Sequence, residues 1–214
     1  MKNLSRKYSR TGNIIVSHIQ KNSREYLIAS IIFIIGILLG IVFVNNLNTI
    51  QTDEITEYLT GAVASLKESE SLNTFAILKS SIQNNILLVI ILWLMGSTVI
   101  GLLLVFLIVC FKGFCLGYTI SSIVFVLGTG KGVILFLINM FLKNIISIPC
   151  IIALTVSGMK VYKSIMQDRR KENIKLEIIR HTIFAAFILA LLILSSFLEV
   201  YVSQVILKYC IKYI

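Results

Sequence analysis

Long apolar segments separated by short charged ones constrain this chain more than any other feature of its sequence. The segment from Leu27 to Val44 contains no charged residue, and neither does the longer one from Ile86 to Phe111. As helices, both are long enough to cross a hydrocarbon core of about 30 Å. With 57% hydrophobic residues and a mean hydropathy of +0.92 over 214 residues, the chain has more apolar surface than a soluble domain can bury. We therefore predict an all-α, polytopic membrane protein with a single integral membrane domain.

The distribution of charge predicts which segments face which side of the membrane. The formal net charge is +10, but the Lys and Arg residues cluster between apolar segments, which argues against nucleic-acid binding. Residues 1–26 and 162–181 are strongly basic and are predicted to be cytoplasmic. Residues 45–85 are rich in acids and are predicted to form an extracytoplasmic loop. The N-terminus is therefore expected inside.

Two short amphipathic helices are predicted within residues 45–85. Apolar residues recur at helical spacing from Ile55 to Leu66, and again from Leu72 to Ile82 behind a polar break. Helices of this kind lie on a membrane surface or against a partner.

The middle of the chain is harder to divide into spans. Residues 86–111 are predicted to cross and to bring the chain back to Lys112 on the cytoplasmic side. Residues 113–127 would then be a short third span of about 22 Å, followed by a glycine-rich turn at 128–132. Residues 133–142 are expected at the outer interface. A re-entrant helix pair within 113–142 is the alternative to a third crossing.

The remaining spans are predicted at residues 144–161 and 182–198. Together with 27–44, 86–111 and 113–127 they give about five crossings in all. The tail, residues 199–214, has one apolar and one polar helical face. It is predicted to be an extracytoplasmic amphipathic helix.

No residue pattern in the chain indicates catalysis, a cofactor or a metal site. The spans contain no carboxylate and no Ser/His, Cys/His or HExxH arrangement, which are the groups that intramembrane enzymes use. The two histidines, His18 and His181, lie beside basic residues at the predicted cytoplasmic face. We predict that the chain is not an enzyme, with no catalytic, cofactor-binding or metal-binding residues.

Two pairs of glycines and one proline are the candidate functional residues. Gly36 and Gly40 in the first span, and Gly113 and Gly117 further on, each remove side chains from one helical face. This allows close approach of another helix, within the bundle or in a partner or second copy of the chain. Pro149 is predicted to kink its span, either as a fixed bend or as a gating hinge, and Asn144 to hydrogen-bond within the bundle nearby.

Several strings of residues resemble those of the stage II sporulation protein M family of endospore-forming bacteria. They are NSREY at 22–26, VNNLN at 44–48, LWLMG at 92–96, FKGFCLGYT at 111–119 and NIISIP at 144–149. The resemblance extends over nearly the whole chain, and 111–119 is its most specific part. Members of the family often carry another proline where this chain has Met140, Phe141 and Leu142.

The resemblance implies a role in engulfment, when the mother-cell membrane migrates around the forespore. It implies a non-catalytic scaffold in the sporulation septum that anchors a peptidoglycan-hydrolase complex. Its partners would be stage II sporulation proteins D and P, a lytic transglycosylase and an amidase or endopeptidase, together with the lipid bilayer.

Two other functions remain open from the residues. In a transporter or channel, the interrupted helices between Gly113 and Leu142 would line a path, with Lys131 or Asn144 in contact with a solute. The basic segment from Lys160 to Arg180 could also bind anionic lipid, in addition to a scaffold role.

Overall fold

The computed structural model describes residues 22–68, 74–136, 142–167 and 171–203, and within these ranges it contains helices and no strands. The elements are α2 (Ser23–Asn45), α3 (Thr49–Glu68), α4 (Thr74–Gly96), α5 (Gly101–Leu127), α6 (Thr129–Phe136), α7 (Leu142–Gln167), α8 (Lys171–Leu198) and the π-helical turn η2 (Glu199–Ser203). The predicted all-α fold is confirmed.

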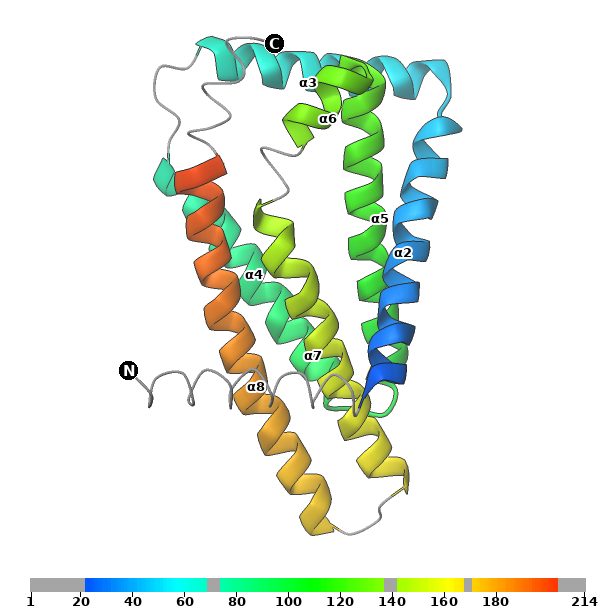
Figure 1. Ribbon diagram of the computed structural model, residues 1–214, viewed down its shortest axis with the longest axis vertical. Coiled ribbons are helices and arrows are strands. Elements are labelled where there is room, and N and C mark those ends of the chain that lie inside the picture. Colours follow the sequence, from blue (N-terminus) through cyan, green and yellow to red (C-terminus); the bar gives the residue numbers. More distant parts are fainter. Residues whose placement is uncertain (1–21, 69–73, 137–141, 168–170, 204–214) are drawn as a thin grey trace, which may run out of the picture.

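Five of these helices are long and apolar enough to cross a membrane. They are α2, α4, α5, residues Lys143–Met166 of α7, and Ile174–Tyr201 of α8 and η2. Figure 1 shows them running along the long axis of the molecule, with α3 lying across one end. We call this the α3 end; the other, where α2 begins and α7 ends, is the opposite end. The prediction of a polytopic helical membrane protein is confirmed.

The boundary expected at Lys112 is wrong, because α5 runs through that residue without interruption from Gly101 to Leu127. The helical structure is interrupted instead at residues 97–100. There the Ser97 and Thr98 hydroxyls donate to main-chain carbonyls of the preceding turn. Thr98 Oγ1 also accepts a hydrogen bond from the Gly101 N–H at 3.1 Å. Such side-chain bonds compete with helix propagation. The expected segments 86–111 and 113–127 are therefore replaced by two full-length helices, α4 and α5, and 113–127 is the second half of α5.

The loop at 45–85 contains one amphipathic helix and not two. α3 corresponds to the first expected helix, whereas the segment expected as the second lies in α4, which begins at Thr74. Its polar residues Ser81 and Asn85 are buried and hydrogen-bonded to α8 and η2, so this part of the chain packs in the bundle. A polar residue that has a partner inside the bundle gives the same sequence pattern as one that faces water.

Three further boundaries differ from the expected ones. The glycine-rich string turns only at Gly128, whose φ is 80°, and α6 begins directly after it. α7 and α8 both extend past their apolar segments into the basic region 162–181. Residues 204–214 of the predicted amphipathic tail lie outside the described residues, as do 1–21.

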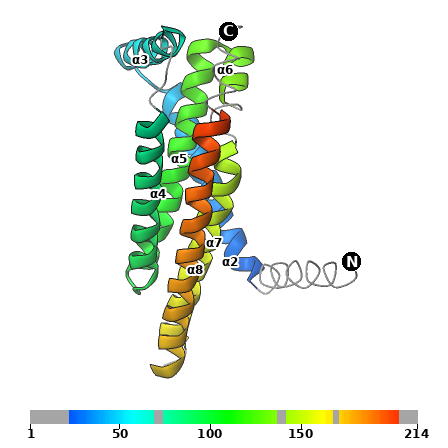
Figure 2. The same cartoon turned by 90° about the vertical axis from the view of Figure 1, so that its left-hand side faces the viewer.

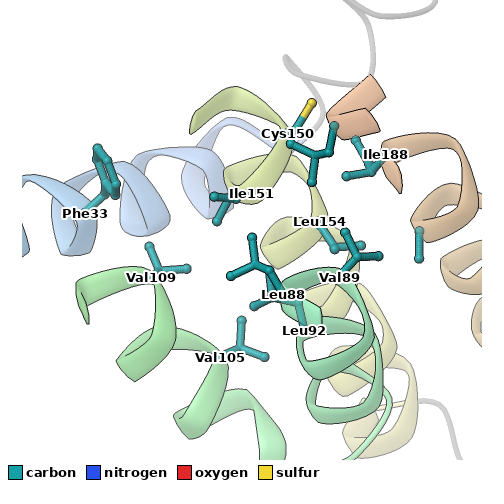
Figure 3. Packing of buried hydrophobic residues seen from close by; sticks show 12 residues of the cluster. Phe33, Leu88, Val89, Leu92, Val105, Val109, Cys150, Ile151, Leu154 and Ile188 are labelled. Atoms are coloured by element: carbon teal, nitrogen blue, oxygen red, sulfur yellow. The ribbon is translucent and has the colours of Figure 1, made fainter. Parts of the chain in front are cut away.

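The buried core joins α4, α5, α7 and α8. Leu92, Leu154 and Leu192 are almost completely buried, and Val105 and Val109 extend the cluster onto α5. Figure 3 shows side chains from these helices meeting in one layer, with Phe33 of α2 at its edge. Large apolar side chains on the outer faces of α2 and α5 are exposed, as expected where lipid replaces water.

Candidate functional site

The four candidate glycines meet in one contact between α2 and α5. A methyl group added to Gly36 or Gly40 would overlap the main-chain carbonyl oxygens of Cys110 or Phe114 on α5. The same addition at Gly113 or Gly117 would overlap the carbonyl oxygens of Phe33 or Ile37 on α2. Figures 1 and 2 show α2 and α5 side by side. The two glycine pairs therefore face each other within this chain, and the small faces of both helices are used in its own bundle.

Aromatic rings extend this contact toward the α3 end. The rings of Phe43 and Phe114 meet edge to face, with centroids 5.6 Å apart, and Tyr118 stacks beside Phe114 at 6.3 Å. Glycines that bring the main chains together and aromatic rings that fill the adjacent space fix one register between the helices.

A buried polar network joins α4 to α8 near the α3 end. Asn85 Nδ2 donates to the carbonyl of Leu192 at 3.2 Å and to Ser196 Oγ at 2.8 Å. Ser81 Oγ donates to Ser196 Oγ at 3.0 Å and also bonds the Glu199 carboxylate. Since lipid offers no hydrogen-bond partners, these groups stabilise the pairing of the two helices.

An ion pair closes the same end of the bundle. Lys143 Nζ, at the start of α7, lies 2.8 Å from Glu199 Oε1 in η2. Ser195 Oγ donates to the Lys143 carbonyl at 3.1 Å and lies 3.5 Å from Ser147 Oγ. The first turn of α7 is thus tied to the end of α8 through charge and through hydroxyl groups.

The candidate residues Asn144 and Pro149 lie in the same half of α7. Asn144 is half-buried and Pro149 is exposed, and both are within one helix that continues to Gln167. The hydrogen bonds recorded between this part of α7 and α8 involve Lys143 and Ser147 instead of Asn144. The structure does not bring Asn144 or Pro149 to the glycine contact.

A second polar site lies at the opposite end of the bundle. His181 of α8 is completely buried, and its Nδ1 lies 2.9 Å from Ser157 Oγ of α7. Its ring packs against Gly96, where an added methyl group would lie 3.0 Å from Nε2, and Gly96 also meets Gly158. His181 is therefore an internal packing residue, and not the surface residue that its basic neighbours suggested.

The opposite end also holds an ion pair between distant parts of the sequence. Glu25, the acid beside the first span, is buried and pairs with Lys163 near the end of α7. Nearby on α4, Trp93 Nε1 donates to Thr182 Oγ1 at 3.0 Å. Among the described residues, ion pairs between helices and hydrogen bonds thus connect the helices at both ends of the bundle.

α3 contacts the bundle along one side of α5 and leaves a shallow groove there. The groove has a volume of about 270 Å³ and is lined by Glu54, Ile55, Tyr58, Leu59, Tyr118, Thr119 and Ser122. The carboxylates of Asp53, Glu54 and Glu57 on α3 are exposed. Among the described residues, no group of three or more His, Cys, Asp or Glu side chains could hold a metal ion.

The sequence predicted that each glycine pair allows a close helix approach, but not that the two pairs face each other, and it gave no prediction of the polar connections between helices. Ser81, Asn85, Lys143 and Glu199 belong to segments that were assigned to a surface loop, to an interfacial piece and to the tail. The available signal was the presence of small polar residues beside or within apolar segments, with Ser81 and Asn85 four residues apart and Ser195 and Ser196 adjacent in the last span.

Comparison with known proteins identifies the family. A family model described as stage II sporulation protein M matches residues 29–204, from α2 to the end of the described chain. Neither the curated proteins nor the solved structures gave a match. Because the family match covers most of the chain, the resemblance in the sequence is confirmed. This chain belongs to the stage II sporulation protein M family of sporulation-related membrane proteins.

Proposed function

We propose that this chain is a non-catalytic membrane scaffold that anchors a peptidoglycan-hydrolase complex at the septal membrane during engulfment. Its partners in this proposal are stage II sporulation proteins D and P, which do the cutting. Membership of the stage II sporulation protein M family is the observation that carries the proposal. The bundle adds support, because its polar groups serve to join helices to one another.

We infer that the α3 end faces away from the cytoplasm. Arg24, Lys160 and Lys163 lie at the opposite end, where α2 begins and α7 ends, and the positive-inside rule favours such an end in the cytoplasm. α3, in contrast, carries exposed Asp53, Glu54 and Glu57. This arrangement would place α3 on the side of the membrane where peptidoglycan is cut.

The surface that α3 presents is a suitable place for an extracytoplasmic partner to bind. The helix touches the bundle through the side that lines the groove with α5, and Tyr58, at the edge of that groove, remains 76% exposed. An exposed aromatic ring flanked by acids fits a partner surface with Lys or Arg residues around an apolar patch.

Affinity capture of the full-length chain from sporulating cells, solubilised in a mild detergent, tests this proposal. Mass spectrometry of the captured material is expected to show stage II sporulation proteins D and P enriched over a mock capture. Replacing Asp53, Glu54 and Glu57 together by Asn or Gln is expected to lower their recovery. The matched control is Lys175→Gln, an exposed charge on α8 toward the opposite end, which should leave recovery unchanged.

Absence of both hydrolases from the wild-type capture would overturn the proposed function. Peptidoglycan cleavage by the purified chain alone would overturn its non-catalytic part. Equal recovery with the triple α3 variant and with wild type would reject α3 as the docking surface.

A further inference from the structure

Lys112 places a positive charge in the middle of a membrane-spanning helix. It lies within α5, about 16 Å from the Gly101 end and about 22 Å from the Leu127 end at the rise of an α-helix. Its side chain is half-buried. Both distances place it deep in a hydrocarbon core of about 30 Å. An ionisable side chain at this depth is costly unless it has a partner.

Among the described residues, no acid forms an ion pair with Lys112. No Asp or Glu occurs in residues 71–167, so α4, α5, α6 and α7 contain none. Of the described acids, Glu25 and Glu199 are already paired with other lysines.

The surroundings of Lys112 show from which side a partner would reach it. Cys115 lies three residues further along α5, which puts it next to Lys112 on the helix surface, and it is exposed. Leu104 and Phe111 are exposed on the same flank of the helix, 41% and 59%. These three residues recur at helical spacing, so they form a stripe beside Lys112 along which a second helix can lie. We call Leu104, Phe111 and Cys115 the α5 stripe.

The depth of Lys112 in the membrane favours a protein partner over a lipid headgroup. The phosphates of lipids lie outside the hydrocarbon core, more than a lysine side chain's length of about 6 Å from the middle of α5. A carboxylate on a transmembrane helix, in contrast, lies at whatever depth its position in that helix gives it.

We propose that Lys112 pairs with a carboxylate in a transmembrane helix of a partner protein, which packs along the α5 stripe. This inference rests on the proposed scaffold function and identifies the partner by an intramembrane acid. It also accounts for an otherwise unpaired charge inside an apolar helix.

The test uses the full-length chain captured from sporulating cells, with three variants of Lys112 and one control variant. Lys112→Met and Lys112→Gln remove the charge, Lys112→Arg keeps it, and Lys175→Gln is the control. Removing the charge is expected to lower recovery of the membrane-anchored partner at least about tenfold, while Lys112→Arg retains most of it. In the purified chain in detergent, Lys112→Met is expected to leave the unfolding temperature unchanged or raise it, because an unpaired charge is removed.

A photoreactive phenylalanine analogue in place of Phe111 identifies what lies on the stripe. It is expected to crosslink to a protein whose transmembrane helix contains Asp or Glu, whereas the same probe in place of Ile34, exposed on α2, gives lipid adducts. Lipid adducts alone at position 111, or equal partner recovery with Lys112→Met, would overturn the inference. If the wild-type chain recovers no hydrolase, it is the proposed function that fails.

Discussion

Lys143 and Glu199, 56 residues apart in the sequence, form an ion pair of 2.8 Å that joins the start of α7 to the π-helical turn after α8. Glu199 is also bonded by Ser81 of α4. One carboxylate thus holds three helices together at the α3 end. A π-helical turn places its side chains differently from an α-helix, and such turns recur where a specific direction is needed.

The first prediction concerns this carboxylate. Glu199→Gln keeps the shape of the side chain but leaves Lys143 without its counter-ion, so the free energy of unfolding in detergent is expected to fall by about 1–2 kcal/mol. The value lies below that of a fully buried pair because both side chains retain some exposure, 27% and 18%. Denaturant-induced unfolding followed by circular dichroism measures it.

A double-mutant cycle separates the pair from its surroundings. Lys143→Met in the Glu199→Gln background is expected to recover part of the loss, because the unpaired ammonium is then absent. Additive losses from the two substitutions would show that the ion pair does not contribute to stability.

The second prediction concerns the contact of α2 with α5. Gly40→Val is expected to separate the helices, because its side chain would meet the main chain at Phe114 and Tyr118, which has no room to move. We expect a loss above about 2 kcal/mol, typical of overpacking at a close contact. The measurement is the unfolding temperature of the purified chain in detergent.

Gly61→Ala is the matched control for that substitution. Gly61 lies in α3 with nothing within 4 Å of an added methyl group, so alanine is expected to be neutral or to stabilise by up to about 1 kcal/mol. Equal losses at positions 40 and 61 would show that glycine itself, and not the close approach, matters at Gly40.

Hydropathy and charge were sufficient to predict the helical class of the fold but not where its helices end. The number of spans follows from the apolar segments, since lipid imposes the same length on each. The α4–α5 break depends on hydrogen bonds of Ser97 and Thr98, within a segment as apolar as the spans themselves. Lys112 was predicted to lie at the end of a span because a charged residue usually marks the edge of the membrane. A lysine that pairs with a partner protein inside the membrane, as we propose for Lys112, can lie in the middle of a span without interrupting its helix.

The candidate site also contains some features that the sequence predicted and others that it did not. The glycine pairs were visible because their spacing of four residues is a local property of one helix. The polar connections depend on which helix lies opposite, as Ser157 does for His181. A single sequence carries no information about such pairings before the helices are placed.

The third prediction tests the buried histidine. Ser157→Ala removes the hydrogen-bond partner of His181 Nδ1, and a buried polar group left unpaired costs about 1–3 kcal/mol. We expect a lower unfolding temperature for this variant. Ser164→Ala, a half-buried serine on the same helix with no recorded hydrogen bond, is the control and should leave the temperature within error of wild type. Equal temperatures for the Ser157 variant and wild type would show that the hydrogen bond is dispensable.

The fourth prediction tests whether the helices are separated at residues 97–100, as in the structure, or at Lys112, as hydropathy and charge suggested. Val99 and Ile100 are 38% and 82% exposed between α4 and α5, at the end of the bundle opposite α3. A cysteine at Val99, in a background in which Cys110, Cys115, Cys150 and Cys210 are serine, is expected to react with a membrane-impermeant maleimide only after cells are permeabilised. The same reagent should label Gly130→Cys, in α6 at the α3 end, in intact cells, and Lys175→Cys only after permeabilisation. The contrary outcome is that Val99→Cys is labelled neither in intact nor in permeabilised cells, while cysteines placed just after Lys112 react from the cytoplasmic side. α4 and α5 would then not end where the structure ends them, and Lys112 would not lie in the middle of the membrane.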